Sequence, residues 1–173
     1  MLSHPNITVR LNTPYEAVRE ELAGYKYLFF TGPIDQFFNY TFGGHLEYRS
    51  IRFEFETIEA EYFQPYAVIN YPNEHEYTRI VEYKHFTGQK NPKTTISKEY
   101  PSWEGEPYYP VPNERNRALY EKYQKEAALM EKDGIFFVGR LANYKYFNMD
   151  QAFRNALDLF ERVAELPKNK VVG

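Results

Sequence analysis

The chain has 173 residues with 24 acidic and 21 basic side chains, which give a formal net charge of −3. This length suits one domain, or one domain and part of another, with a sizeable core. A mildly acidic chain without a block of like charges is a poor match for nucleic acid or an anionic membrane surface. The sequence has no cysteine, which excludes disulfides and thiolate metal sites. It also lacks a leader-like N-terminus and a membrane-length apolar run, which predicts a cytoplasmic protein.

The first part of the chain has the pattern of a strand, a helix and a second strand. Residues 7–11 (ITVRL) alternate between apolar and polar side chains, as a strand does. Thr13 is placed to cap a helix with Pro14 in its first position, and Gly24 ends that helix. Residues 27–30 (YLFF) form an apolar run typical of a buried strand. We therefore expect a β-α-β unit with parallel strands and a right-handed crossover.

The middle of the chain changes to a period of two, which predicts antiparallel strands. Apolar and charged side chains alternate over residues 48–57. Further strands are expected over residues 66–70, 77–86 and 94–100, with polar connections between them. Residues 101–112 form a proline-rich connection to the last part of the chain.

The final third predicts a helix, a strand, a polar loop and a second helix. Asn113 caps the first helix, and residues 135–139 (IFFVG) are a short apolar strand. Asn148 caps the second helix, whose apolar stripe covers residues 149–163. The loop between strand and helix carries four polar or charged side chains: Arg140, Tyr144, Lys145 and Tyr146. A strand, a polar loop and a helix N-terminus together present free N–H groups to an anionic ligand. Residues 167–173 are expected to be a frayed tail.

These elements predict a mixed α/β (α+β) fold in which an antiparallel β-sheet is inserted into a partial parallel sheet with flanking helices. The expected division is residues 1–46 for the β-α-β part, 47–112 for the antiparallel sheet and 113–173 for the returning helices and strand. The glycine-rich phosphate fingerprint G-x-G-x-x-G does not occur. A surplus of aromatic residues, 17 Tyr and 14 Phe, predicts lined clefts as well as a core.

Six blocks of the sequence resemble the C-terminal half of bacterial UDP-galactopyranose mutase, a flavoprotein, in the order found in that family. They are TGPIDQFFNYTFG (31–43), LEYRSIRFE (46–54), YTRIVEYKHF (77–86), KEYP (98–101), EPYYPV (106–111) and GRLANYKYFNMDQ (139–151). The resemblance implies an FAD-binding-type domain around the parallel strands and a substrate domain around the antiparallel sheet. The family's N-terminal half, with its dinucleotide-binding glycine motif, has no counterpart here, so the chain is expected to be a fragment of a longer enzyme.

The resemblance also implies an activity for the parent protein. The family interconverts UDP-galactopyranose and UDP-galactofuranose. Reduced FAD is its working cofactor, and N5 of the flavin is thought to attack the anomeric carbon and displace UDP, without net redox change. The isolated chain is expected to be inactive and not to retain FAD. UDP-galactose is the expected partner of the parent protein, and self-association into a homo-oligomer is expected of the isolated chain because apolar surface is left exposed.

Substrate residues follow from the same resemblance. Arg79 matches an arginine that binds the diphosphate, Arg49 matches a second active-site arginine, and Glu99 matches an active-site acid. These three are the expected catalytic groups. Asn148 stands where the family usually has an acidic residue, so the helix cap is kept and the charge is lost. The other expected substrate contacts are two tyrosines that reach the diphosphate and two asparagines: Tyr109, Tyr146, Asn70 and Asn148.

A second set of residues is assigned to FAD by the resemblance. Thr31 and Gly32 match a turn beside the cofactor, where glycine permits close approach of the backbone. Arg140 matches an FAD-contacting arginine at the end of the last strand. The first turn of the last helix is also assigned to the flavin, with three residues: Met149, Asp150 and Ala152. The four histidines lack the spacing of metal ligands, so no metal site is expected.

Two other function classes stay open. One is a non-catalytic domain that binds a nucleotide sugar or carbohydrate and stacks its aromatic side chains on sugar rings. The other is a glycosidase that uses two of Glu99, Glu104 and Glu106, which requires two carboxylates at a defined separation. Separate titrations with UDP and galactose distinguish the non-catalytic domain from a mutase fragment, because arginines favour the diphosphate and aromatic rings favour the sugar.

Overall fold

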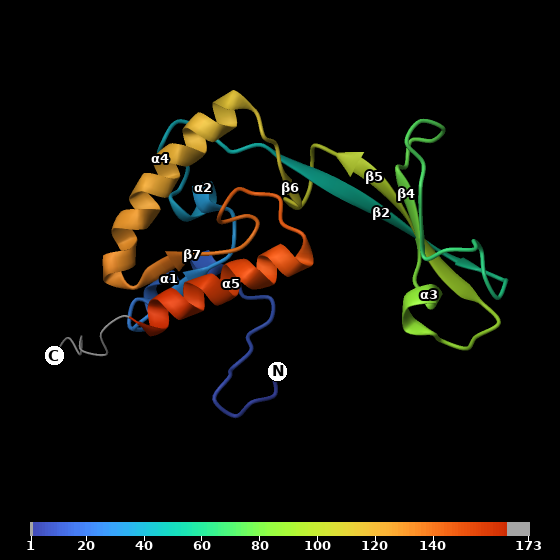
Figure 1. Ribbon diagram of the computed structural model, residues 1–173, viewed down its shortest axis with the longest axis horizontal. Helices are drawn as coiled ribbons and strands as arrows, with labels where there is room; N and C mark the ends of the chain where they lie inside the picture. Colours follow the sequence, from blue (N-terminus) through green and yellow to red (C-terminus); the bar gives the residue numbers. More distant parts are fainter. Residues whose placement is uncertain (1, 166–173) are drawn as a thin grey trace.

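The computed structural model describes residues 2–165 and shows an elongated molecule with two sheets (Figure 1). An α/β unit built from both ends of the chain lies at one end, and a five-stranded antiparallel sheet extends away from it. The long strand β2 (Tyr48–Ile58) connects the two parts. The mixed α/β architecture with an antiparallel insert is therefore confirmed. The tail expected over residues 167–173 lies outside the described residues.

The small parallel sheet consists of strands that are far apart in the sequence. Strand β1 (Leu28–Phe30) pairs in parallel with β7 (Ile135–Phe137) over three residue pairs. Side chains alternate between the two faces of this sheet. Phe137 packs into the core beneath one face, whereas Phe29 stacks on Phe136 at the other face, with ring centroids 5.4 Å apart.

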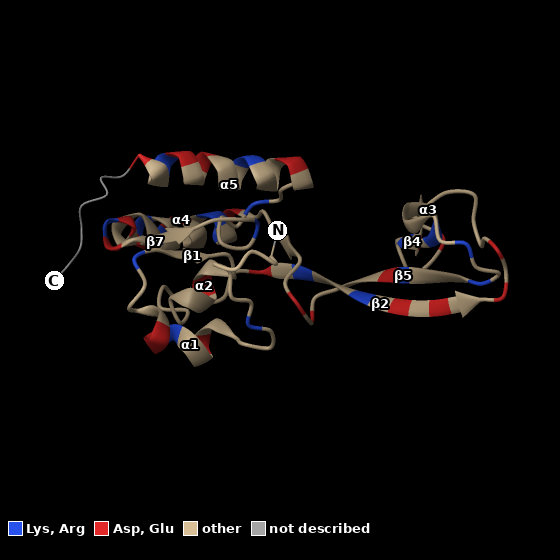
Figure 2. Cartoon of the chain, turned by 90° about the horizontal axis from the view of Figure 1, so that it is seen from below, with Lys and Arg blue, Asp and Glu red and all other residues tan. Residues whose placement is uncertain are grey.

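Helices cover both faces of the parallel sheet (Figure 2). The helices α1 (Tyr15–Leu22) and α2 (Ile34–Phe37) lie on one side, and α5 (Met149–Ala164) lies on the other. Helix α4 (Glu114–Met130) lies level with the strands and contacts β7. Helix α4 continues into a short 3-10 helix, η1 (Glu131–Asp133). In the described part of the chain, these helices form layers around a parallel sheet of two strands, whereas parallel sheets usually have more strands.

Helix α4 forms as its sequence predicts. The side-chain oxygen of Asn113 accepts a hydrogen bond from the backbone N–H of Asn116 at 2.8 Å, which confirms the N-cap. Leu119, Tyr123 and Ala127 lie on one face of the helix and are buried in the main core cluster. The helix is therefore fixed to the sheet by the same stripe that its sequence displays.

The antiparallel sheet has the strand order β3-β4-β5-β2-β6. Besides β2 it contains β3 (Val68–Asn70), β4 (Arg79–Glu82), β5 (Thr94–Ser102) and β6 (Tyr109–Pro110). A short helix, α3 (Lys84–Thr87), follows β4 where the sequence predicts a longer strand. The longest pairing, between β2 and β5, continues without a bulge from Ser50 opposite Ser102 to Ile58 opposite Thr94. Because the pairing is regular, odd-numbered and even-numbered residues of β2 project from opposite faces of the sheet.

The strand expected over residues 7–11 is wrong. These residues form no strand, and Ile7, Val9 and Leu11 are exposed. An alternating segment needs a neighbouring strand for its backbone hydrogen bonds, and β1 pairs with β7 instead. The expected β-α-β unit is thus replaced by a parallel pair from opposite ends of the chain. Thr13 also does not cap α1, because its hydroxyl donates to the carbonyl of Leu11 at 2.9 Å.

Gly134, at the entrance to β7, is expected to tolerate no side chain. Its φ is +80°, and a Cβ atom there would lie 2.4 Å from the carbonyl oxygen of Lys26. Gly134→Ala should therefore lower the free energy of unfolding by about 1–3 kcal/mol, measured by urea denaturation. Gly24→Ala is the control, because its Cβ would meet no atom closer than 3.9 Å, and it should change stability by about 1 kcal/mol or less. Equal changes in the free energy of unfolding for the two variants would contradict the conclusion that Gly134 cannot carry a side chain.

Candidate functional site

A row of polar side chains crosses one face of the antiparallel sheet. Asn70 lies opposite Arg79, Arg79 lies opposite Glu99, and Glu99 lies opposite Phe53. Residues directly opposite one another in antiparallel strands project from the same face. Three of the residues assigned to the substrate, Asn70, Arg79 and Glu99, therefore form one continuous row.

The guanidinium group of Arg79 is held from two sides within this row. Its Nε donates to Oδ1 of Asn70 at 3.0 Å, and its Nη1 lies 3.5 Å from a carboxylate oxygen of Glu99. The Glu99 side chain is only 12% exposed, whereas that of Arg79 is 43% exposed. The Arg79 fork is thus oriented by its neighbours and still accessible to an anion, which is the arrangement that bidentate phosphate binding requires.

Arg49 and Tyr109 project from the same face, nearer the α/β unit. They lie opposite each other where β2 pairs with β6. Arg49 is four residues before Phe53 in β2, so the two side chains share a face. The guanidinium carbon of Arg49 lies 4.1 Å from the ring centre of Trp103, which keeps it at the sheet surface.

Arg140 and two tyrosines form a second cluster beside this face. The rings of Tyr109 and Tyr146 are stacked, with centroids 5.8 Å apart and planes at 22°. The guanidinium carbon of Arg140 lies 5.3 Å from the ring centre of Tyr109 and 4.9 Å from that of Tyr146. Arg140 also donates to the backbone carbonyl of Phe147. The sheet and the loop after β7 thus bring one cation and two phenols together.

Two aromatic residues lie between the Arg79 row and the Arg140 cluster. Phe53 ends the row and packs edge-on against Tyr108, with centroids 6.0 Å apart. Tyr108 precedes Tyr109 and accepts a hydrogen bond from Arg140 at its backbone oxygen, at 3.4 Å. The sequence patterns indicate neither residue as part of the site, although Tyr108 precedes Tyr109 in the EPYYP segment.

The residues assigned to FAD lie at the carboxyl ends of the parallel strands. Thr31 and Gly32 follow β1, and Arg140 follows β7. A Cβ atom on Gly139 would lie 4.0 Å from Cβ of Thr31, so the two strand ends are adjacent. In open α/β sheets, ligands bind at this edge.

The first turn of α5 is the other part of the predicted cofactor site. The Asn148 N–H donates to Oε1 of Gln151 at 2.9 Å, which confirms the helix start that the sequence predicts. Met149, Asp150 and Ala152 follow in this turn, and Met149 is 85% exposed. The positive end of the helix dipole is therefore accessible beside Arg140 and Tyr146.

Tyr144 has a structural role and does not face the anion site that the loop was expected to form. It is buried, its hydroxyl donates to the carbonyl of Glu47 at 2.6 Å, and it accepts from the N–H of Val111 at 3.1 Å. Burial is the main cause that raises the pKa of Tyr144 to about 12. Its ring packs edge-on against Tyr48, so it fixes the loop to the start of β2.

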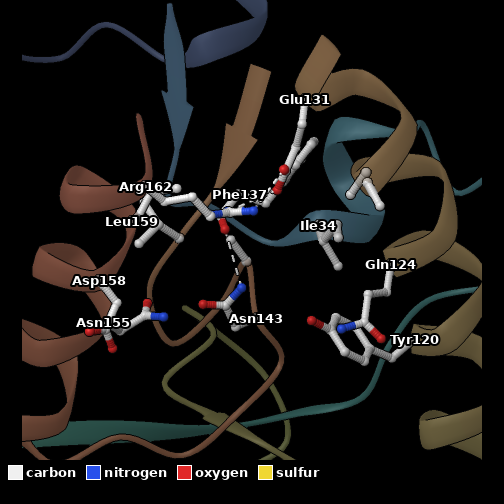
Figure 3. Close-up of a pocket in the computed structure, with 14 residues that line it drawn as sticks. Ile34, Tyr120, Gln124, Glu131, Phe137, Asn143, Asn155, Asp158, Leu159 and Arg162 are labelled. Atoms are coloured by element: carbon white, nitrogen blue, oxygen red, sulfur yellow. Dashed lines mark hydrogen bonds and ion pairs between the residues drawn. The ribbon is translucent and has the colours of Figure 1, made fainter. Parts of the chain in front are cut away.

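A pocket of about 370 Å³ lies between α4, β7 and α5 (Figure 3). Within it, Arg162 of α5 forms a two-bond ion pair with Glu131, at 2.8 and 3.0 Å. Asn143 and Asn155 both accept from the N–H of Gly139, at 3.2 and 2.9 Å. These amides fix the backbone just before Arg140, so the pocket supports the predicted site and does not contain it.

Within residues 2–165, no three His, Asp or Glu side chains are grouped as metal ligands, and no helix has the length and apolarity needed to cross a membrane.

Comparison with known proteins identifies the family. A family model described as UDP-galactopyranose mutase matches residues 1–146. The chain belongs to the UDP-galactopyranose mutase family. It is 37% identical over 174 aligned residues to the UDP-galactopyranose mutase of Mycoplasma genitalium, with 88% of this chain and 41% of the relative covered. It is 38% identical over 159 residues to a probable UDP-galactopyranose mutase of Klebsiella pneumoniae, covering 89% of the chain and 40% of the relative.

Another relative of similar identity carries a different name. The chain is 36% identical over 167 residues to a dTDP-fucopyranose mutase of Escherichia coli, with 91% of the chain and 44% of the relative covered. The chain thus spans about two fifths of the length of these curated relatives. The family match includes the sheet face and Arg140, and it ends before Asn148 and the first turn of α5.

Proposed function

We propose that this chain forms one wall of the active site of a flavin-dependent mutase, which interconverts UDP-galactopyranose and UDP-galactofuranose in the longer protein. The observation that carries the proposal is the single sheet face on which the predicted substrate residues of different strands converge: Asn70, Arg79, Glu99, Arg49 and Tyr109. The residue groups 1–46, 47–112 and 113–173 would act as parts of a larger cytoplasmic enzyme.

Diphosphate is the chemical group that this face suits best. Negative charge develops on a departing diphosphate, and a fixed positive charge with hydrogen-bond donors stabilises it. Arg79 supplies an oriented guanidinium fork, and Tyr109 and Tyr146 supply hydroxyl donors without added charge. Glu99 orients Arg79 through the ion pair, which supports a positioning role for that carboxylate.

Diphosphate is also the group that the differently named relatives share. One curated relative is named for a UDP-sugar and another for a dTDP-sugar, at nearly equal identity to this chain. Their common substrate feature is a sugar linked to a nucleoside diphosphate. The face around Arg79 would therefore bind the diphosphate, and UDP-galactose is the proposed substrate because several of the relatives are named for it.

FAD fits the edge at the carboxyl ends of β1 and β7. Thr31 and Gly32 lie at this edge, Arg140 supplies a cation, and the accessible start of α5 supplies free N–H groups. When bound, reduced FAD would supply the nucleophile for the anomeric carbon. The residues of this chain would orient the diphosphate and the flavin edge, with Tyr146 and Arg140 between them.

Separate titrations of the isolated chain test the diphosphate site. Trp103 is the single tryptophan and lies against Arg49, so its fluorescence reports on this face. We expect a saturable response to UDP that Arg79→Ala weakens by about tenfold or more, because an oriented charge-assisted contact is lost. Arg52→Ala is the matched control: Arg52 projects from the opposite face of β2, and its removal should leave the UDP response unchanged.

A non-catalytic sugar-binding domain is the second candidate. The rings of Phe53, Phe55 and Tyr83 form an exposed ladder on the same face, with neighbouring centroids 6.2 Å apart. Such a ladder can stack on sugar rings. This alternative predicts a response to galactose without UDP that Phe55→Ala removes. A response to UDP alone would exclude it.

The isolated chain should be purified without flavin. It contains the proposed Arg140 and α5 contacts, but no glycine-rich turn for the pyrophosphate of FAD. We therefore expect no flavin absorbance bands in the purified chain and no mutase activity, with self-association into a homo-oligomer at high concentration. Stoichiometric flavin in the purified chain would contradict this prediction.

A further inference from the structure

The predicted apolar stripe of α5 is only partly used inside this chain. Val163 of the predicted stripe is buried against Phe136, together with Leu159, which lies beside the stripe. Phe153 and Phe160, on the same stripe, are 69% and 67% exposed. In Figure 2, α5 forms the outermost layer on its side of the parallel sheet, and no described segment lies beyond it. Half of the helix stripe therefore has no partner among residues 2–165.

The exposed part of the stripe borders a hollow in the surface. The hollow has a volume of about 620 Å³ and lies between α5 and the strand ends, with Tyr27, Phe29, Ala156 and Phe160 among its lining residues. Its lining is almost entirely apolar, although it is open to solvent. Soluble proteins rarely leave a contiguous apolar surface of this kind uncovered. We define this region, the hollow and the exposed α5 stripe, as the apolar face.

The other side of α5 carries polar and charged side chains, so the apolar face is confined to one side of the helix. Asn155 there accepts from Gly139, and Arg162 pairs with Glu131. Arg154 pairs with Asp158 and Glu161. The polar side chains on this side of α5 have hydrogen-bond or ion-pair partners within the chain. A partner from elsewhere is therefore needed only on the apolar side.

The lengths of the relatives indicate what covers the apolar face. The curated relatives align with 88–91% of this chain, but this alignment accounts for only 40–44% of their own length. Among residues 2–165, the small parallel sheet also has only two strands, fewer than such sheets usually contain. We infer that the apolar face is the docking surface for the portion of a full-length family protein that this chain does not span, which contributes an apolar layer against α5 and β1. This inference depends on the family membership and not on the proposed catalysis.

Single thiols on α5 test the inference, because the chain has no cysteine of its own. Phe160→Cys places a thiol on the apolar face, and Glu161→Cys places one of similar exposure on the polar side. Each variant is made in the isolated chain and in a joined polypeptide, in which the uncovered portion of the Klebsiella pneumoniae relative is fused to this chain. Maleimide labelling rates are measured in all four proteins, and labelling requires neither turnover nor flavin.

We expect both thiols to react at similar rates in the isolated chain at dilution. In the joined polypeptide, labelling of Phe160→Cys should slow by about tenfold or more, while Glu161→Cys stays unchanged. Equal rates for Phe160→Cys in the two proteins would overturn the inference. Protection of Phe160→Cys in a dimer of the isolated chain, together with no protection in the joined polypeptide, would also overturn it, because the face would then join two copies. If the joined polypeptide does not fold, the two portions are mixed as separate chains, and failure to form a complex overturns the inference as well.

Discussion

Replacing Arg79 by alanine in the joined polypeptide is expected to lower kcat/KM for UDP-galactopyranose by about 10²–10³-fold. The reason is geometric. The Arg79 fork is fixed between Asn70 and Glu99, so its charge needs no reorganisation when negative charge develops on a diphosphate. Alanine removes both the charge and the donors and leaves the Glu99 carboxylate without its counter-ion. The measurement is initial rate of sugar interconversion against substrate concentration.

Two further variants separate this role from a loss of structure. Arg52→Ala removes an arginine from the opposite face of the same sheet, where it pairs with Glu54 at 2.6 Å, and should change kcat/KM by about twofold or less. Arg79→Lys keeps the charge but not the two-pronged geometry, so it should fall between wild type and Arg79→Ala. Turnover that survives Arg79→Ala at the wild-type rate would remove Arg79 from the site.

Local elements of this fold could be predicted from the sequence because their signals are local. The cap at Asn113, the buried stripe of α4 and the start of α5 at Asn148 each depend on residues within one or two helical turns. The sequence predicts strand β2 at nearly its full length, because apolar and polar side chains alternate along Tyr48–Ile58.

Partnerships between distant segments could not be predicted in this way. Residues 7–11 alternate like a strand, but the neighbour that would satisfy their backbone is absent among residues 2–165, so they remain exposed. The Asn70–Arg79–Glu99 row depends on the register of three strands, which no single segment encodes. The family resemblance named these residues, and the register shows that they share a face.

The same limit explains which site residues were missed or misjudged. Phe53 and Tyr108 meet only because β6 pairs beside β2, so their contact has no signal in either segment. The sequence places Tyr144 in the polar loop, but its hydroxyl forms hydrogen bonds with backbone groups of Glu47 and Val111. In a chain with 17 tyrosines, only the packing distinguishes a structural phenol from an accessible one.

Glu82 is expected to be the most important polar residue for the stability of the antiparallel sheet. It is fully buried in β4, and its carboxylate accepts from the N–H groups of Phe63 and Gln64, both at 2.9 Å, and from the hydroxyl of Thr94 at 2.7 Å. Glu82→Gln places an amide N–H₂ against these donors, so at least one buried bond is lost. We expect the free energy of unfolding to fall by about 2–4 kcal/mol at neutral pH, measured by urea denaturation.

The dependence of this effect on pH distinguishes a buried charge from a simple packing defect. Burial raises the pKa of Glu82, but the bonds from Thr94, Phe63 and Gln64, with His85 3.3 Å away, outweigh it and hold the pKa below the ordinary 4.5. Because the folded-state pKa is depressed, the ionised carboxylate stabilises the sheet above the unfolded-state pKa, and this contribution is lost as pH falls through the folded-state value. The difference between wild type and Glu82→Gln should therefore be constant near neutral pH and shrink below about pH 4.5. Glu56→Gln, at an exposed ion pair with Lys98, should change stability by about 0.5 kcal/mol or less, and a pH-independent difference for Glu82→Gln would contradict the buried charge.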